Sequence, residues 1–149
     1  MNEKPRWLVI TWKLGADTST PRVTTWRTLR RIGAVSLTPG AAVVPHSEEL
    51  LEQLDWLAQD IADSGGEAWV LPVTALSERE EAELRARTRD DRRAEYDELR
   101  GDARRLRTHA TPRARGALER RFARVVARDH FAAPGRLTAR RAIDAVSGG

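Results

Sequence analysis

The stretch STPRVTTWRTLRRIG, residues 19–33, predicts a helix around which the first part of the chain is arranged. Ser19 or Thr20 can cap its first amides, and Pro21 suits the first helical position. Gly33 supplies the left-handed residue that ends a helix. An apolar residue recurs at every third position, which predicts a stripe facing the core: Val23, Trp26, Leu29 and Ile32.

The arginines of this stretch are the first candidate binding residues. Arg27, Arg30 and Arg31 lie three and four positions apart, so they share a second face of the helix, and Arg22 stands at its start. Guanidinium groups and helix amides hold phosphates and tetrahedral oxyanions. The four arginines are therefore predicted to bind a nucleic-acid backbone or an oxyanion, with a merely solvated face as the alternative.

The segments around this helix predict an α+β domain over residues 1–76. WLVITWKL (7–14) is a strand, residues 34–37 and 41–44 form a hairpin around Pro39-Gly40, residues 47–63 form a second helix and residues 68–73 a fourth strand. This βαββαβ order is that of ferredoxin-like folds, an antiparallel sheet with two helices on one face. Trp12 and Trp26 are expected in the core, and Trp7 and Trp69 on outer strand faces.

Residues 77–149 predict a charged helical extension. Ser77 and Glu80 match a capping box, and a long helix runs from there to about residue 106, its first half exposed to solvent. A second helix from Pro112 to about residue 130 completes an antiparallel hairpin, and residues 137–146 form a short last helix. The apolar seams expected to face each other are Tyr96, Leu99, Ala103 and Leu106 on the first helix, and Leu118, Phe122, Val125 and Val126 on the second.

The positive charge of the chain is concentrated at its end. The whole chain carries a net charge of +4, whereas residues 104–149 hold 12 arginines against three acidic residues, a net of +9. Such an arm suits phosphates or an acidic partner. GC-rich coding alone would also produce the excess of arginine, since Lys4 and Lys13 are the only lysines. The candidate nucleic-acid or oxyanion ligands in the second hairpin helix are Arg113, Arg120, Arg121, Arg124 and Arg128.

Several classes of protein are disfavoured. The chain has no cysteine, no apolar run long enough to cross a membrane and no signal-peptide pattern at its start, so a cytoplasmic protein without a membrane partner is expected. His46, His109 and His130 stand far apart, and Asp129-His130 lacks a third ligand, so neither a metal nor another cofactor is predicted. No catalytic motif is present, and the chain is not expected to be an enzyme.

Taken together, several segments resemble one known family. WLVITWKL, PRVTTWRTLRRIGA, VSLTPGAAVVP, DWLAQDIADSGGEAWVLPV, RRAEYDELRG and RDHFAAPGR resemble the N-terminal domain of ChrB proteins, the chromate-resistance regulators. The resemblance covers roughly residues 7–145. It implies a cytoplasmic protein that binds DNA and controls its operon in response to chromate. Longer members of the family carry a C-terminal domain that this sequence lacks.

The strand pattern is also similar to that of phenylacetate-pathway repressors and of the small endoribonuclease of CRISPR spacer acquisition. That nuclease has a metal-binding aspartate directly after an aromatic residue at the end of its first strand. Here the tripeptide is Trp12-Lys13-Leu14, and a lysine cannot hold a divalent cation. A degenerate nuclease is therefore the minor alternative.

The first hypothesis is a transcriptional regulator of the ChrB type that binds DNA, forms a homodimer and responds to chromate or another oxyanion. The second is an oxyanion-responsive or scaffold protein whose partners are proteins and not DNA.

Overall fold

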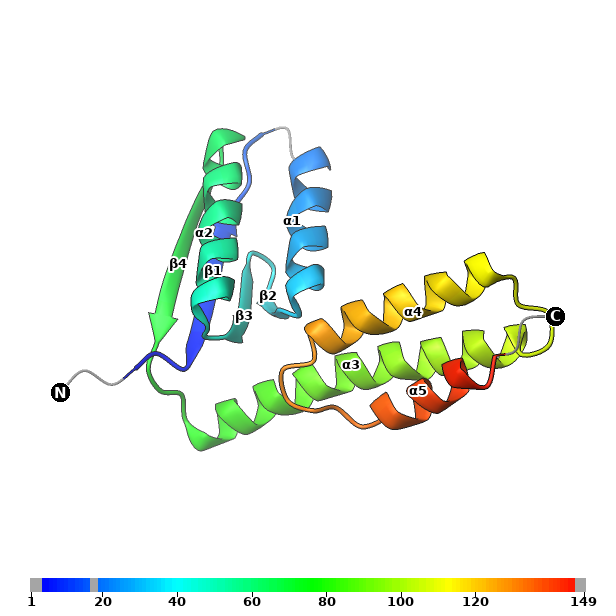
Figure 1. Cartoon of the computed structure of the whole chain (residues 1–149). Helices are drawn as coiled ribbons and strands as arrows, with labels where there is room; N and C mark the ends of the chain where they lie inside the picture. The colour runs from blue at the N-terminus through cyan, green and yellow to red at the C-terminus, as the bar shows by residue number, and fades with distance from the viewer. Residues whose placement is uncertain (1–3, 17–18, 147–149) are drawn as a thin grey trace. The chain divides into compact units, whose positions relative to one another are not determined.

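The computed structural model describes residues 4–16 and 19–146 (Figure 1). The α+β class is confirmed: four strands and two helices form the first part of the described chain, and three further helices follow. In chain order the elements are β1 (Trp7–Lys13), α1 (Ser19–Ile32), β2 (Val35–Thr38), β3 (Ala41–Pro45), α2 (Glu48–Asp63), β4 (Glu67–Val73), α3 (Glu78–Leu106), α4 (Pro112–Ala127) and α5 (Arg136–Asp144).

The chain forms two compact units, Met1–Leu84 and Arg85–Gly149. The division falls within α3, whereas the sequence suggested a boundary where that helix begins, between residues 76 and 77. The first unit therefore contains the sheet, α1, α2 and the first turns of α3. The second contains the rest of α3 with α4 and α5.

The sheet of the first unit is antiparallel and has the order β2-β3-β1-β4. The central strand β1 pairs with β3, where Leu8 lies opposite Val44, and with β4, where Thr11 lies opposite Trp69. Helices α1 and α2 cover one face (Figure 1). The core residues on that face include Leu8, Ile10 and Val44 of the sheet, Leu29 and Ile32 of α1, and Leu54, Leu57 and Ile61 of α2.

The predicted stripe of α1 is only half right. Leu29 and Ile32 are buried, but Val23 is 54% exposed and Trp26 38% exposed. Among the described side chains of the helix, Thr25 is also buried, and it precedes Leu29 by four residues and Ile32 by seven. Residues three apart drift by about 60° per step around a helix, so a stripe of four such residues turns away from the core at one end. In α1 it is the N-terminal end, with Val23 and Trp26, that turns away from the core.

The start of α1 also differs from the expectation. The helix begins at Ser19, so Pro21 is its third residue rather than its first. Pro21 still lies in the first turn, where no intrahelical bond is lost through its missing N–H. Gly33 ends the helix as predicted: its φ is 78°, and the N–H of Ala34 donates to the carbonyl of Leu29 at 3.0 Å.

The outer face of the sheet is not uniformly exposed. Trp69 is 68% exposed and Leu71 45% exposed on the edge strand β4, as expected for Trp69. Trp7 lies on the same face by strand register, as predicted, but unlike Trp69 it is buried, with only 3% of its surface exposed. Val35 and Val43, paired opposite each other on this face, are also buried. Among the described residues of this face, Trp69 on β4 is the large aromatic side chain that is exposed to solvent.

In the second unit, α3 and α4 run antiparallel with α5 beside them (Figure 1). Their shared core contains Tyr96, Leu99 and Ala103 of α3, Leu118, Phe122 and Val125 of α4, and Ala139 and Ile143 of α5. Thr111 caps α4 by accepting a hydrogen bond from the N–H of Ala114 at 3.1 Å, and Pro112 follows it. The predicted apolar seams of the hairpin are confirmed.

The first half of α3 is less exposed than the sequence suggested. Leu84, Thr88 and Arg92 are all buried, at four-residue spacing. They continue the line that Tyr96 and Leu99 follow further along the helix. The apolar pattern does not reveal this line, because two of its three residues are polar. Within the described part of the chain, no helix is long and apolar enough to span a membrane.

Candidate nucleic-acid interface

All four candidate arginines of α1 are exposed: Arg22, Arg27, Arg30 and Arg31. Helix α1 contains no acidic residue, and none of the four has a carboxylate within ion-pair distance among residues 4–16 and 19–146. A guanidinium group without an internal partner remains able to pair with an external anion. Helix α1 therefore presents an uncompensated positive surface.

The four arginines lie on two sides of α1. Arg22, Trp26 and Arg30 follow one another at four-residue spacing and so form one row, whereas Arg27 and Arg31 form another. The N-terminal part of the first row borders a groove of about 750 Å³ between α1, the end of β1, β2 and the β2–β3 turn. Arg22 and Trp26 both line this groove, and Trp12 of β1 lines it with them.

Helix α4 carries a further exposed row of arginines. Arg113, Arg120 and Arg124 are separated by seven and four residues, so they share the side of α4 that faces away from Leu118 and Phe122. In the part of the chain that the structure describes, these three arginines have no ion pair. The row extends over about 16 Å of helix, at 1.5 Å per residue.

The other two candidate arginines of α4 are engaged by α3. Arg121 pairs with Asp102 at 2.8 Å and lies 4.0 Å from Glu98, and Arg128 pairs with Glu95. Burial raises the pKa of Asp102, but hydrogen bonds from Arg121 and Arg105 outweigh it and hold that pKa below its usual range. Both arginines hold the hairpin together, so they are less available to an external anion than the outward row.

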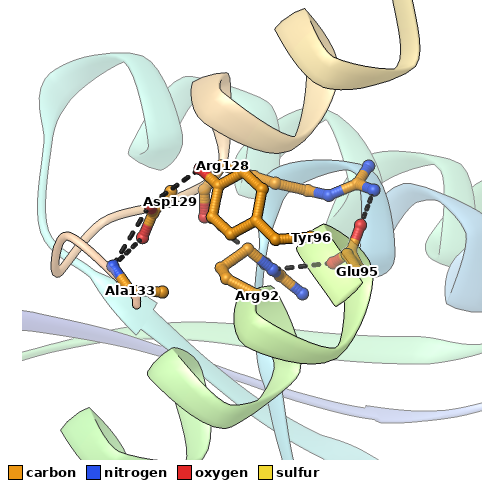
Figure 2. A network of polar contacts seen from close by, with 6 residues as sticks. All are labelled: Arg92, Glu95, Tyr96, Arg128, Asp129 and Ala133. Atoms are coloured by element: carbon orange, nitrogen blue, oxygen red, sulfur yellow. Dashed lines mark hydrogen bonds and ion pairs between the residues drawn. The ribbon is translucent and has the colours of Figure 1, made fainter. Parts of the chain in front are cut away.

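Figure 2 shows the polar network around Arg128. The buried Tyr96 donates its hydroxyl to Asp129 Oδ2 at 2.9 Å, and the N–H of Ala133 donates to Asp129 Oδ1 at 2.9 Å. Arg92 pairs with Glu95 at 2.7 Å and donates to the carbonyl of Arg128 at 3.3 Å. These contacts fix the loop between α4 and α5 against α3.

Sequence reasoning did not find this network. It noted Asp129 only beside His130, as a weak metal-type pair, whereas the carboxylate of Asp129 accepts hydrogen bonds from Tyr96 and Ala133. The available signal was Arg92, because an arginine on the core-facing line of a helix requires a buried partner. Among the described residues, no group of three or more His, Asp or Glu side chains could hold a metal ion.

A third group of contacts attaches α5 to α4. Arg140 binds both carboxylate oxygens of Glu119, at 2.8 and 2.6 Å, and its guanidinium carbon lies 4.9 Å from the ring centre of Phe122. The hydrogen bonds from Arg140 lower the pKa of Glu119 and raise that of Arg140 itself. Glu119 is the one acidic residue of α4, and it faces this partner rather than the outward arginine row.

The fold and these surfaces define a small α+β module with a helical hairpin and three arginine rows, two on α1 and one on α4, that have no ion-pair partner among the described residues. The model of the family described as "Protein ChrB, N-terminal" matches residues 22–111, more than half of the chain. The chain belongs to this family. Protein ChrB of Cupriavidus metallidurans is 38% identical to it over 92 residues, which are 62% of this chain and 28% of that protein. No solved structure matches the chain.

The matched range contains the whole α1 arginine group and ends before Pro112, where α4 begins. The outward row of α4 lies outside the matched range. The chain spans only a small part of the length of the ChrB protein it resembles.

Proposed function

We propose that this chain is a regulatory module of the ChrB type, associated with chromate resistance, which acts in the cytoplasm by binding DNA rather than by catalysis. The observation that carries the proposal is the contrast between the two sets of arginines on α4. Arg121 and Arg128 are paired with carboxylates of α3, whereas Arg113, Arg120 and Arg124 face outward without an ion pair among the described residues. Three unpaired cations in one row suit a phosphate backbone.

The proposal predicts how strongly the affinity for DNA depends on salt concentration. Each phosphate neutralised on duplex DNA contributes about −0.9 to the slope of log affinity against log salt. If each arginine of the outward row contacts one phosphate, the triple variant Arg113→Ala/Arg120→Ala/Arg124→Ala makes that slope shallower by about 2.7. The measurement is fluorescence anisotropy of labelled duplex DNA, including the sequence upstream of the protein's own gene, over a salt series.

A matched control removes the same charge elsewhere. Arg79, Arg93 and Arg104 are exposed residues of α3, and the variant Arg79→Ala/Arg93→Ala/Arg104→Ala also lowers the net charge by three. We expect this control to keep nearly the full salt slope. Equal losses in both variants would mean that net charge alone attracts the DNA, and a wild-type protein that ignores duplex DNA at low salt would refute the proposal.

We also propose that the module responds to chromate or a similar tetrahedral oxyanion through α1. This is supported by the uncompensated guanidinium groups of Arg27, Arg30 and Arg31, which are the donors that such a dianion requires. A ligand that binds only the folded state raises the melting temperature with occupancy. Thermal melts with chromate, sulfate and phosphate, on the wild type and on Arg27→Ala/Arg31→Ala, test this. Identical melting temperatures with and without each anion would refute it.

We further propose that the first unit has ferredoxin-like topology and forms a homodimer through β4. The topology is supported by two successive βαβ segments, β1–α1–β2 and β3–α2–β4. In the sheet, β3 lies between β1 and β2, and β1 lies between β3 and β4. The dimer is supported by Trp69 and Leu71, which are exposed on an edge strand. Light scattering should show a dimer that Trp69→Lys dissociates and Trp56→Lys on α2 does not. A monomeric wild type would refute it.

A further inference from the structure

The groove beside α1 combines aromatic surface with a positive charge. It is lined by Trp12, Trp26 and Arg22, together with Leu37 of β2 and Pro39 of the β2–β3 turn. The rings of Trp12 and Trp26 are nearly perpendicular, with centroids 6.4 Å apart. A volume of about 750 Å³ lies within the range of sites that hold small organic molecules.

The two sides of the groove formed by β1 and by the β2–β3 turn are joined by a backbone hydrogen bond. The N–H of Trp12 donates to the carbonyl of Gly40 at 2.8 Å, and a Cβ added at Gly40 would lie 2.7 Å from the carbonyl oxygen of Trp12. The turn is thus held directly against β1. Trp12 packs partly on the core, whereas Trp26 remains 38% exposed on the helix opposite. The indole ring of Trp26 is therefore accessible to a flat ligand and is carried by the regular backbone of α1.

The two arginines on either side of Trp26 indicate which class of ligand fits the groove. Arg22 and Arg30 precede and follow Trp26 by four residues, which places each about 6 Å away along the axis of α1. Both are exposed, and α1 holds no acidic residue. An apolar peptide would leave these charges without partners, and a small oxyanion would leave the indole unused. A nucleotide in a single strand has a flat base with a phosphate on either side, and so matches all three side chains.

We propose that this groove binds one unpaired nucleotide of single-stranded DNA. The base stacks on Trp26, and Arg22 and Arg30 pair with the phosphates that flank it. This site is separate from the outward row of α4, which reads only the backbone of a duplex. The groove instead requires a base released from pairing, since the face of a paired base is covered by its neighbours in the stack.

The test measures binding of labelled oligothymidine of about ten nucleotides to the full chain. Trp26→Ala should weaken binding about tenfold, because stacking on an aromatic ring is the main sequence-tolerant contribution at such sites. Arg22→Ala should weaken binding and make the salt slope shallower by about 0.7, the contribution of one phosphate in a single strand. The matched control is Trp56→Ala, which removes another exposed tryptophan, on α2, and should bind as the wild type does.

Further binding measurements distinguish this site from the duplex-binding surface and test other classes of ligand. Trp26→Ala should bind duplex DNA with unchanged affinity, while the triple variant of α4 should keep most of its oligothymidine binding. If the wild type binds duplex DNA but not oligothymidine, the groove proposal fails and the duplex proposal stands. Equal weakening by Trp26→Ala and Trp56→Ala would also overturn it. So would tighter binding of oligouridine or of a poly-glutamate peptide, which would assign the groove to RNA or to an acidic protein.

Discussion

The change Tyr96→Phe isolates one hydrogen bond in the interior of the helical unit. Tyr96 is fully buried, and its hydroxyl donates to Asp129 Oδ2 at 2.9 Å. The substitution keeps the ring, its tilted contact with Phe122 at 6.1 Å between centroids, and the close approach of Gly135, where an added Cβ would lie 3.2 Å from Tyr96 Cβ. Only the hydroxyl oxygen and its bond to the carboxylate are lost.

The expected cost follows from the charge of the acceptor. Hydrogen bonds to charged groups contribute about 1.5–3 kcal/mol, roughly twice the value between neutral groups. Asp129 keeps the hydrogen bond from the N–H of Ala133, so its carboxylate remains partly satisfied and the lower half of that range applies. We expect Tyr96→Phe to lower the free energy of unfolding by about 2 kcal/mol.

Alkaline pH provides a second readout of the same bond. Burial, with the hydrogen bond to Asp129 as the next cause, raises the pKa of Tyr96 well above its ordinary value of about 10. A raised pKa in the folded state means that the stability it contributes is complete below about pH 10 and is lost as the pH rises further. The wild type should therefore lose stability above about pH 10, and Tyr96→Phe should lose less.

The assay is urea unfolding followed by far-ultraviolet circular dichroism, with Asp129→Asn as the second arm of a double-mutant cycle. In the Asp129→Asn background, Tyr96→Phe should cost at least about 1 kcal/mol less, because the charged acceptor is already gone. A cost below about 0.5 kcal/mol, or the same cost in both backgrounds, would refute the reasoning.

Three further changes test other contacts. Hydrogen bonds from Arg140 lower the pKa of Glu119, so the stability that the Glu119 carboxylate adds is present above about pH 4.5 and is lost as the pH falls. Acid unfolding of Glu119→Gln should therefore show a weaker pH dependence than that of the wild type. Gly40→Ala should cost at least about 1 kcal/mol in urea unfolding, because φ is 85° there and the new Cβ would meet the backbone of β1; wild-type stability would contradict this. Trp26→Ala should cost only about 1–2 kcal/mol, less than Leu29→Ala at roughly 2–5 kcal/mol, because Trp26 is partly exposed; the reverse order in thermal melts would show that Trp26 belongs to the core.

The element order was predictable because local signals agree at the ends of most helices. Ser47 accepts a hydrogen bond from the N–H of Leu50 at 3.0 Å, and Ser77 from that of Glu80 at 3.2 Å, as their sequences indicate. The burial of single side chains was less predictable. Trp7 lies on the predicted strand face, but its exposure depends on what covers that face, and no periodicity within the strand contains this information.

The candidate site shows the same limit. The exposure of most arginines on α4 follows from the position of Phe122 and the other core residues on that helix. Which arginines have partners does not, because Arg121 and Arg128 are paired only through the alignment of α4 against α3, where residue 121 meets 102 and residue 128 meets 95. This alignment depends on tertiary packing between segments more than 15 residues apart, which composition and helical period do not specify.

The division of the chain into two units also separates its aromatic residues by type. All five tryptophans lie within Met1–Leu84, and the single tyrosine, Tyr96, lies within Arg85–Gly149. Each unit thus has its own intrinsic optical label. Selective excitation of tryptophan follows the sheet unit alone, and the tyrosine band of second-derivative ultraviolet spectra, in which tyrosine and tryptophan separate, follows the hairpin. Whether the two units melt together or in succession can therefore be observed on the unmodified chain, without any added dye.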